Sequence, residues 1–465
     1  MSRRIAASLL AAVCAAPSCS CAPEPSAPHN LVVLSLDTTR RDHLPFYGYP
    51  RDTAPRMADL AARGIVFDDA VAVHTNTAPA HASMLTGLYP AQHGIERNGE
   101  RLRGDVATLA GILTADGYAT AAFVSGWTLT RHTGLDRGFA VYDQALREER
   151  RRDAEWTLAA ALPWLDARAD DDAPFFLFFH LFDPHHPYDP PEDWARRFLP
   201  EGVPSFTLDP GARDPGRAAD LALSEAEVAE YVARYDGEIA WADHHLGLLL
   251  ERLAALGLAE RTVVVFTSDH GETLHERAWV FDHGARLYEE QVRIPLVIRL
   301  PGDRGAGARV RAPVSQVDLL PTLLELLEIP LPRELAGRSL LPLLEGGPSV
   351  DLERPTFAQA RPVAERVPEL GAPLARTGLV AMVRVPGAKL IEYPLHGRDG
   401  WARQLFDLTD DPGETRDVAG ERSARLASLR ALLLAFRRAT EPARSEPAPL
   451  TPEIEKALRE LGYAP

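Results

Sequence analysis

The chain has 465 residues, enough for one large domain and a smaller one. Hydrophobic residues make up 46% and charged residues 25%, as in ordinary globular proteins. The net charge of −16 argues against a nucleic acid as main partner, because phosphate backbones bind basic surfaces. An anionic small molecule can still bind if its pocket is locally positive.

Residues 1–28 have the features of an export leader followed by a Pro-rich linker. Arg3 and Arg4 precede an apolar run, Ile5 to Ala16, that is too short to cross a bilayer. This segment also holds every cysteine of the chain: Cys14, Cys19 and Cys21. We expect an exported bacterial protein, either periplasmic or anchored to the membrane as a lipoprotein through Cys19 or Cys21. The folded part needs no disulfide.

Strand-like and helix-like segments alternate along residues 29–375. Apolar runs predict strands at 31–36, 118–124, 175–181, 262–267 and 295–300. Helices are expected at 55–63, from Thr77 onward, at 105–115, 145–167 and 224–256, the last with Ser224 and Glu227 as a capping box. Such alternation predicts an α/β fold whose mostly parallel sheet is sandwiched by helices.

The pattern changes near residue 376. Two segments, 377–385 and 388–393, predict a β-hairpin, and a strand at 404–408 and a helix at 421–438 follow. We therefore expect a small C-terminal subdomain over 376–440, with an antiparallel sheet and one helix. Residues 441–465 are predicted to form a Pro-rich tail with a short helix at 452–461.

Polar residues stand at the ends of three buried strands. Asp37 follows the first, His180 lies near the end of the second, and Asp269-His270 follow the third. Ligands of parallel sheets bind beyond the carboxyl ends of the strands, so these side chains are expected to meet there. Carboxylate and imidazole groups suit Mn²⁺, Zn²⁺ or Ca²⁺, and one divalent ion is the economical reading.

Thr77 stands where a helix begins, with Pro79 in the first turn. Backbone N–H groups at a helix start favour anions, so a hydroxyl here is placed to meet an ester. We predict that Thr77 is the nucleophile and also a metal ligand beside Asp37, Asp269 and His270. His81 lies one turn later and is expected to orient Thr77. Taken alone, Asp37 could cap a turn and Thr77 a helix.

Two further histidines lie in or near the segments already described. His180 ends a strand, and His283 lies in the segment after Asp269. Both are predicted to bind an ester oxygen or to protonate the leaving group. Glu272 is expected to support the site rather than bind the metal.

With these residues in view, the chain resembles the sulfatase family of the alkaline phosphatase superfamily from about residue 30 to 418. The resemblance rests on the segments 30–37, 77–90 with His93-Gly94, 176–180, 267–272 and 405–408 with 411–414. It implies an alkaline-phosphatase-like α/β sandwich, a small C-terminal sheet-and-helix subdomain and hydrolysis of an ester of sulfate or phosphate.

The chain departs from the family at positions that matter for chemistry. Sulfatases carry a Cys or Ser that is oxidised to formylglycine where this chain has Thr77, and threonine does not undergo that conversion. His81 replaces an Arg, Thr38 replaces a second metal-binding Asp, and the Lys expected near His283 is not evident. The set resembles relatives with a threonine nucleophile, which include phosphodiesterases and phosphoglycerol transferases.

We therefore expect a metal-dependent hydrolase in which Thr77 attacks, with phosphodiesters or phosphomonoesters favoured over sulfate esters as substrates. The substrate is a small molecule or a glycan or lipid ester. One alternative is a transferase that passes a phospho-group to a lipid or sugar hydroxyl. Another is a binding protein that keeps the fold without catalysis.

Overall fold

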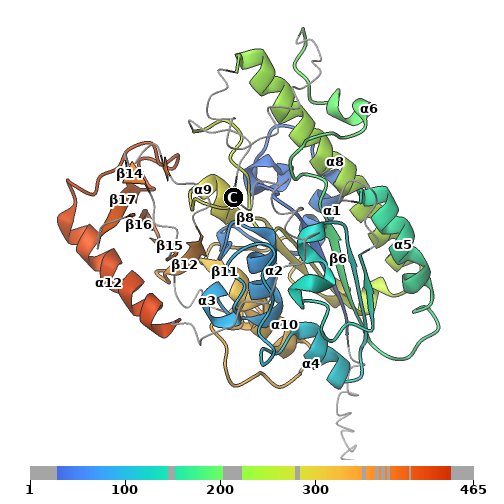
Figure 1. Cartoon of the computed structure of the whole chain (residues 1–465). Coiled ribbons are helices and arrows are strands. Elements are labelled where there is room, and N and C mark those ends of the chain that lie inside the picture. The colour runs from blue at the N-terminus through green and yellow to red at the C-terminus, as the bar shows by residue number, and fades with distance from the viewer. Residues whose placement is uncertain are drawn as a thin grey trace, which may run out of the picture.

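The computed structural model in Figure 1 describes nine stretches of the chain. They are residues 29–144, 152–202, 223–277, 283–347, 352–361, 366–367, 372–373, 378–396 and 400–440. The leader at 1–28 and the tail at 441–465, with its helix at 452–461, lie outside these residues and stay predictions.

An eight-stranded sheet forms the centre of the molecule, in the order β10-β2-β9-β7-β1-β6-β4-β5. Its strands are β1 (Asn30–Leu36), β2 (Ile65–Phe67), β4 (Ala119–Val124), β5 (Val141–Asp143), β6 (Phe175–Leu181), β7 (Thr262–Thr267), β9 (Leu296–Arg299) and β10 (Arg309–Val310). β9 alone is antiparallel to its neighbours, β7 and β2. The predicted mostly parallel sheet is confirmed, and β1 lies between β6 and β7 in parallel register.

Successive side chains of β1 feed two separate cores, because a strand turns alternate residues to opposite faces. Leu31 and Val33 join a core built with α2 (Thr77–Thr86), α4 (Leu109–Ala115) and α10 (Leu319–Leu326). Val32 and Leu34 join the core on the other face, with α1 (Pro55–Arg63), α5 (Ala154–Asp166) and α8 (Glu225–Ala255). Helices therefore cover both faces, which explains why β1, β6 and β7 are almost continuously apolar.

Capping side chains set where the helices begin. Ser224 and Glu227 form the predicted capping box at the start of α8. α4 begins at Leu109 instead of Asp105, because the Thr108 hydroxyl accepts the Gly111 N–H and fixes the first turn there. Asp153 likewise caps α5, which begins at Ala154. Residues 145–151 of the predicted helix lie outside the described residues.

A second, four-stranded antiparallel sheet forms the C-terminal part, to the left in Figure 1. It consists of β12 (Thr356–Ala360), β15 (Val380–Val385), β16 (Ala388–Pro394) and β17 (Trp401–Asp407), and α12 (Ser423–Ala439) packs on it. β15 and β16 form the predicted hairpin. The sheet extends across the predicted boundary at 376, since β12 precedes that residue.

The remaining helices and strands are short. The strands β3 (Ala70–Val71), β8 (Arg293–Ile294) and β11 (Val314–Ser315) form a three-stranded sheet, and β13 (Arg366–Val367) pairs with β14 (Ala372–Pro373). The short helices are α3 (Pro90–His93), α6 (Glu192–Ala195), α9 (Glu289–Val292) and α11 (Leu341–Leu344).

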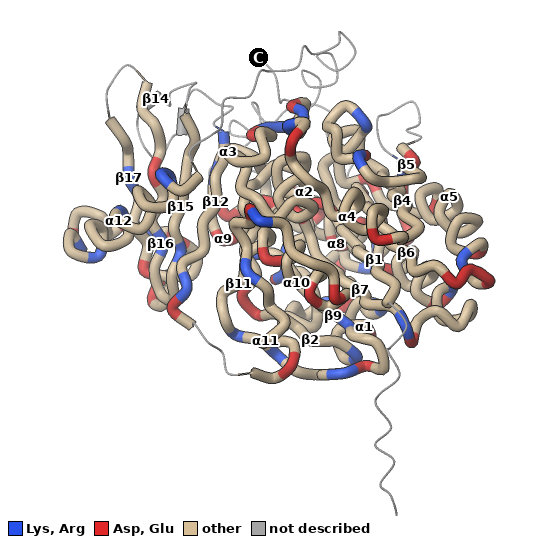
Figure 2. The backbone as a smooth tube through the Cα atoms, turned by 90° about the horizontal axis from the view of Figure 1, so that it is seen from below, with Lys and Arg blue, Asp and Glu red and all other residues tan. Residues whose placement is uncertain are grey.

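Basic and acidic positions are interspersed around the molecule in the view of Figure 2, with no continuous basic stripe there. The absence of a nucleic-acid partner stays a prediction. Among the described residues, no helix combines the length and the apolar character that crossing a membrane requires.

Candidate active site and metal centre

The three central strands bring their polar ends to one edge of the sheet. Asp37 follows β1, and its N–H donates to the Leu181 carbonyl at the end of β6, 2.9 Å away. His180 lies in β6 and binds Asp37 through Nε2, 3.2 Å from Oδ2. Asp269 and His270 follow β7, on the other side of β1. The structure thus places these four side chains, all fully buried, together.

Asp37, Asp269 and His270 offer one ligand atom each, and these atoms lie within 4.8 Å of one another. Two ligands at about 2.0–2.5 Å from one cation can be separated by that distance. Within the described part of the chain, the buried atoms here without a hydrogen-bond partner include Asp37 Oδ1, Thr77 Oγ1, Asp269 Oδ2 and His270 Nε2. Buried polar atoms are rarely left unpaired, so this donor set fits a divalent cation.

The His270 ring is oriented for metal binding. Its Nδ1–H donates to the Gly271 carbonyl at 2.9 Å, which leaves the lone pair on Nε2. Burial lowers the pKa of His270 to about 4, although Asp269 opposes that shift. The ring is therefore neutral near pH 7, as a metal ligand must be.

The two carboxyl groups have opposite electrostatic surroundings. Burial, followed by repulsion from Asp269 and Glu272, raises the pKa of Asp37 well above its usual value, and the nearby Thr77 hydroxyl partly offsets this. Burial alone would raise the pKa of Asp269 too, but His270, His81 and His180 hold it below its usual value. A cation would relieve the repulsion that Asp37 meets.

Thr77 is the first residue of α2, and its side chain is fully buried. Its helix is held at the start by His81, whose Nδ1–H donates to the Thr77 carbonyl at 2.8 Å. His81 Nε2 accepts from the Ser35 hydroxyl, also at 2.8 Å. His81 therefore contacts the backbone of Thr77, not its hydroxyl, and fixes α2 against β1.

His283 lies on the His270 side of the site, with the two ring centroids 4.6 Å apart. The His283 Nδ1–H donates to Glu272 Oε1 at 2.9 Å. Glu272 is fully buried and also accepts from the Tyr188 hydroxyl at 3.1 Å. Glu272 thus fixes the tautomer and orientation of His283, while His180 approaches from the opposite strand.

The turn after Asp37 is strained and is held by α8. Thr38 has a φ of +49°, a left-handed conformation that threonine rarely adopts. Its N–H donates to Asp269 Oδ1 at 3.1 Å. The Tyr235 hydroxyl donates to the Thr38 carbonyl at 2.8 Å and accepts the Arg40 N–H at 2.9 Å. These bonds hold Asp37 and Asp269, the candidate metal-binding carboxylates, in place.

Replacing Tyr235 by phenylalanine is expected to destabilise the protein by about 2–4 kcal/mol, because two buried backbone groups lose their partner. Metal affinity should fall with it, since the turn that carries Asp37 loosens. Urea unfolding and metal titration measure the two effects. Tyr118→Phe removes one hydroxyl bond, to the His29 carbonyl, and should cost about 1 kcal/mol. Equal stability of the Tyr235 and Tyr118 variants would contradict the expected role.

Sequence reasoning missed three supporting residues. Asn98 accepts the Ala78 N–H at 2.9 Å, and its buried Nδ2 has no partner among the described residues. Asn76, directly before Thr77, is also buried with an unpartnered amide. Gln316 donates to the carbonyls of Ser268 and Asp269, at 3.1 and 2.6 Å. Asn76 adjoins the predicted nucleophile, but only the fold shows the proximity of Asn98 and Gln316.

Comparison with known proteins places this geometry in a family. Residues 29–329 match the family model described as Sulfatase. The chain is 30% identical to an ulvan-active sulfatase of Formosa agariphila, covering 86% of this chain and 78% of that protein. It is 25% identical to an N-acetylglucosamine-6-O-sulfatase of Bacteroides thetaiotaomicron, covering 84% and 83% of the two chains.

A solved structure shares the fold. The phosphonate monoester hydrolase of Agrobacterium radiobacter superposes with a TM-score of 0.72 at 23% identity, covering 89% of this chain and 96% of that one. The matched segment at 29–329 contains every residue of the site described above. The chain therefore belongs to the sulfatase family and is a sulfatase-like hydrolase.

Proposed function

We propose that this protein hydrolyses phosphate esters, diesters or monoesters, with Thr77 as nucleophile and one divalent cation as cofactor. The observation that carries the proposal is the Thr77 hydroxyl, which is buried beside Asp37 at the start of α2. A threonine does not yield formylglycine, so the attacking oxygen is that of the side chain itself.

The cation would be held by Asp37, Asp269, His270 and the Thr77 hydroxyl; when bound, it supplies charge that acidifies that hydroxyl and screens the anionic ester. The hydrogen bond between His180 Nε2 and Asp37 Oδ2 orients the Asp37 carboxylate in the site. The N-terminus of α2 adds a positive potential where negative charge develops on the ester.

The Glu272–His283 pair is the proposed proton-transfer unit. Glu272 holds the proton on Nδ1 of His283, so Nε2 is the position that exchanges a proton with the leaving oxygen. The His270 ring lies 4.6 Å from the His283 ring, centroid to centroid, so this pair lies next to the proposed metal ligands.

A leaving-group comparison tests this unit. His283→Gln should lower kcat about 10²-fold or more for an alkyl ester, whose leaving oxygen needs a proton. It should lower kcat less than about tenfold for a 4-nitrophenyl ester, whose leaving group is stable as an anion. Equal losses on both esters would assign His283 a different role. Glu272→Gln should show the same pattern, more weakly.

The relatives favour a second candidate, hydrolysis of sulfate esters, because the 30% identical protein is named an ulvan-active sulfatase. Assays of metal-free protein with defined metals added, on aryl sulfate, aryl phosphate and aryl phosphodiester, separate the two. Phosphodiester or phosphomonoester preference is expected. A preference for the sulfate would overturn the proposal on substrate class.

A further inference from the structure

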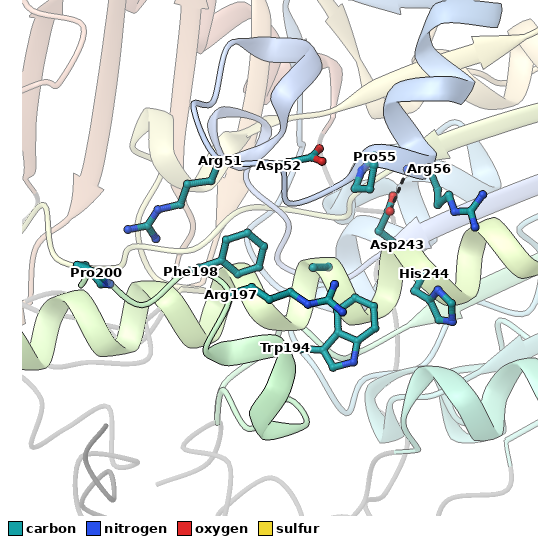
Figure 3. Close-up of a pocket in the computed structure, with 11 residues that line it drawn as sticks. Arg51, Asp52, Pro55, Arg56, Trp194, Arg197, Phe198, Pro200, Asp243 and His244 are labelled. Atoms are coloured by element: carbon teal, nitrogen blue, oxygen red, sulfur yellow. Dashed lines mark hydrogen bonds between the residues drawn. The ribbon is translucent and has the colours of Figure 1, made fainter. Parts of the chain in front are cut away.

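A pocket with a volume of about 780 Å³ lies away from the candidate metal centre (Figure 3). Its walls come from the loop before α1, from α6 and the residues after it, and from α8. Known ligand pockets span about 300–1,000 Å³, so this one has room for one or two sugar rings. None of the residues of the metal site lines it.

One wall of the pocket is aromatic. Trp194 and Phe198 line it together with His244, whose ring centroid lies 5.5 Å from that of Trp194. The Trp241 ring packs nearly perpendicular to that of Trp194, with the two centroids 5.5 Å apart. Such rings are flat apolar surfaces, and the C–H face of a pyranose ring packs on surfaces of this kind.

The same pocket carries three arginines with different partners. Arg51 is paired with Asp236 at 2.7 Å and Arg56 with Glu251 at 2.8 Å. Arg197 stands over the Trp194 ring, 3.7 Å from its centroid, and has no carboxylate partner among the described residues. Stacking orients a guanidinium without neutralising it, so Arg197 keeps its charge for an anion.

Two acidic residues line the pocket, Asp52 and Asp243, and neither is paired with Arg197. Asp243 accepts the N–H groups of Arg56 and Met57, at 3.0 and 2.8 Å, and so caps α1. Asp52 stands across the pocket from Arg197 in Figure 3. Arg197, which has no carboxylate partner among the described residues, therefore lies beside the aromatic wall.

We propose that this pocket binds a saccharide ring carrying an anionic substituent, with the ring against Phe198 and the anion on Arg197, which stacking on Trp194 holds in place. The site would anchor a glycan at a distance from the metal centre. This inference goes beyond the proposed function and does not depend on it, since binding here requires neither Thr77 nor the cation.

Calorimetric titration of the full-length protein with a sulfated dextran oligosaccharide tests the proposal. Wild type should bind it, and Trp194→Ala and Arg197→Gln should each weaken binding about tenfold or more. Unsulfated dextran of the same length should bind much more weakly. Thr77→Ala should bind like wild type, which separates this site from the proposed catalytic one.

Two matched variants serve as controls. Trp156 is a tryptophan on α5 that is 46% exposed, and Arg196 neighbours Arg197 but is paired with Glu192. Trp156→Ala and Arg196→Gln should leave binding unchanged. The proposal is overturned if wild type does not bind, if Trp194→Ala and Arg197→Gln both bind normally, or if inorganic sulfate competes at the concentration of the oligosaccharide.

Discussion

Replacing Thr77 by alanine is expected to lower kcat/KM for the best ester substrate by at least about 10³-fold, because the attacking oxygen is lost. The side chain is fully buried at the first position of α2, and the bond that anchors this turn uses its carbonyl, not its hydroxyl. The fold should therefore persist. Steady-state kinetics and thermal unfolding of the same preparation measure both effects.

Thr77→Ser is the matched control, since it keeps the hydroxyl and removes only a methyl group. It should retain activity within about tenfold of wild type, and mass spectrometry during turnover should detect a covalent adduct on residue 77 in both active proteins. Alanine at this position with normal turnover would refute the nucleophile, whatever the metal content.

The arrangement of the catalytic part could be predicted from the sequence because its central strands are unusually simple. β1, β6 and β7 are buried on both faces, so their sequences are almost continuously apolar and their ends are marked by the polar residues that follow. Asp37 and Asp269 therefore had to reach the same edge once the sheet was parallel. Predicting this convergence did not require knowing which individual distant residues contact each other.

The supporting contacts could not be predicted in the same way. Tyr235 meets Thr38 only because α8 lies in one register against the sheet, and a helical pattern does not give that register. Asn98 approaches α2 from a loop. Likewise β12, with the short sequence Thr356–Ala360, carries no clear alternation and joins its sheet through pairing with β15. Such contacts depend on tertiary packing, which local patterns do not encode.

Asp37→Asn is expected to have opposite effects on stability without and with metal. In metal-free protein, Asp37 is fully buried, and its ionised form is further disfavoured by repulsion from Asp269 and Glu272. The asparagine oxygen can still accept from His180, so the variant removes repulsion at little cost. Its metal-free form should be more stable than wild type by about 1–3 kcal/mol.

Saturating metal should reverse that order. Wild type gains about 4.1 kcal/mol at a metal concentration of 1,000 times Kd, whereas the variant loses a charged ligand and gains far less. Thermal unfolding with and without Mn²⁺ or Zn²⁺ measures both, and activity should fall at least about 10²-fold.

The pH dependence of the metal-free proteins provides an independent check of this explanation. The pKa of Asp37 is raised in the folded state, so the protein binds that proton more tightly when folded, and stability is lost as pH rises from the usual value near 3.8 through the folded pKa. Asparagine does not titrate. The advantage of Asp37→Asn should therefore vanish at low pH and grow across that window. A difference that stays constant at all pH values would mean that the variant acts through packing. The explanation by repulsion between buried carboxylates, which a bound cation would relieve, would then be wrong.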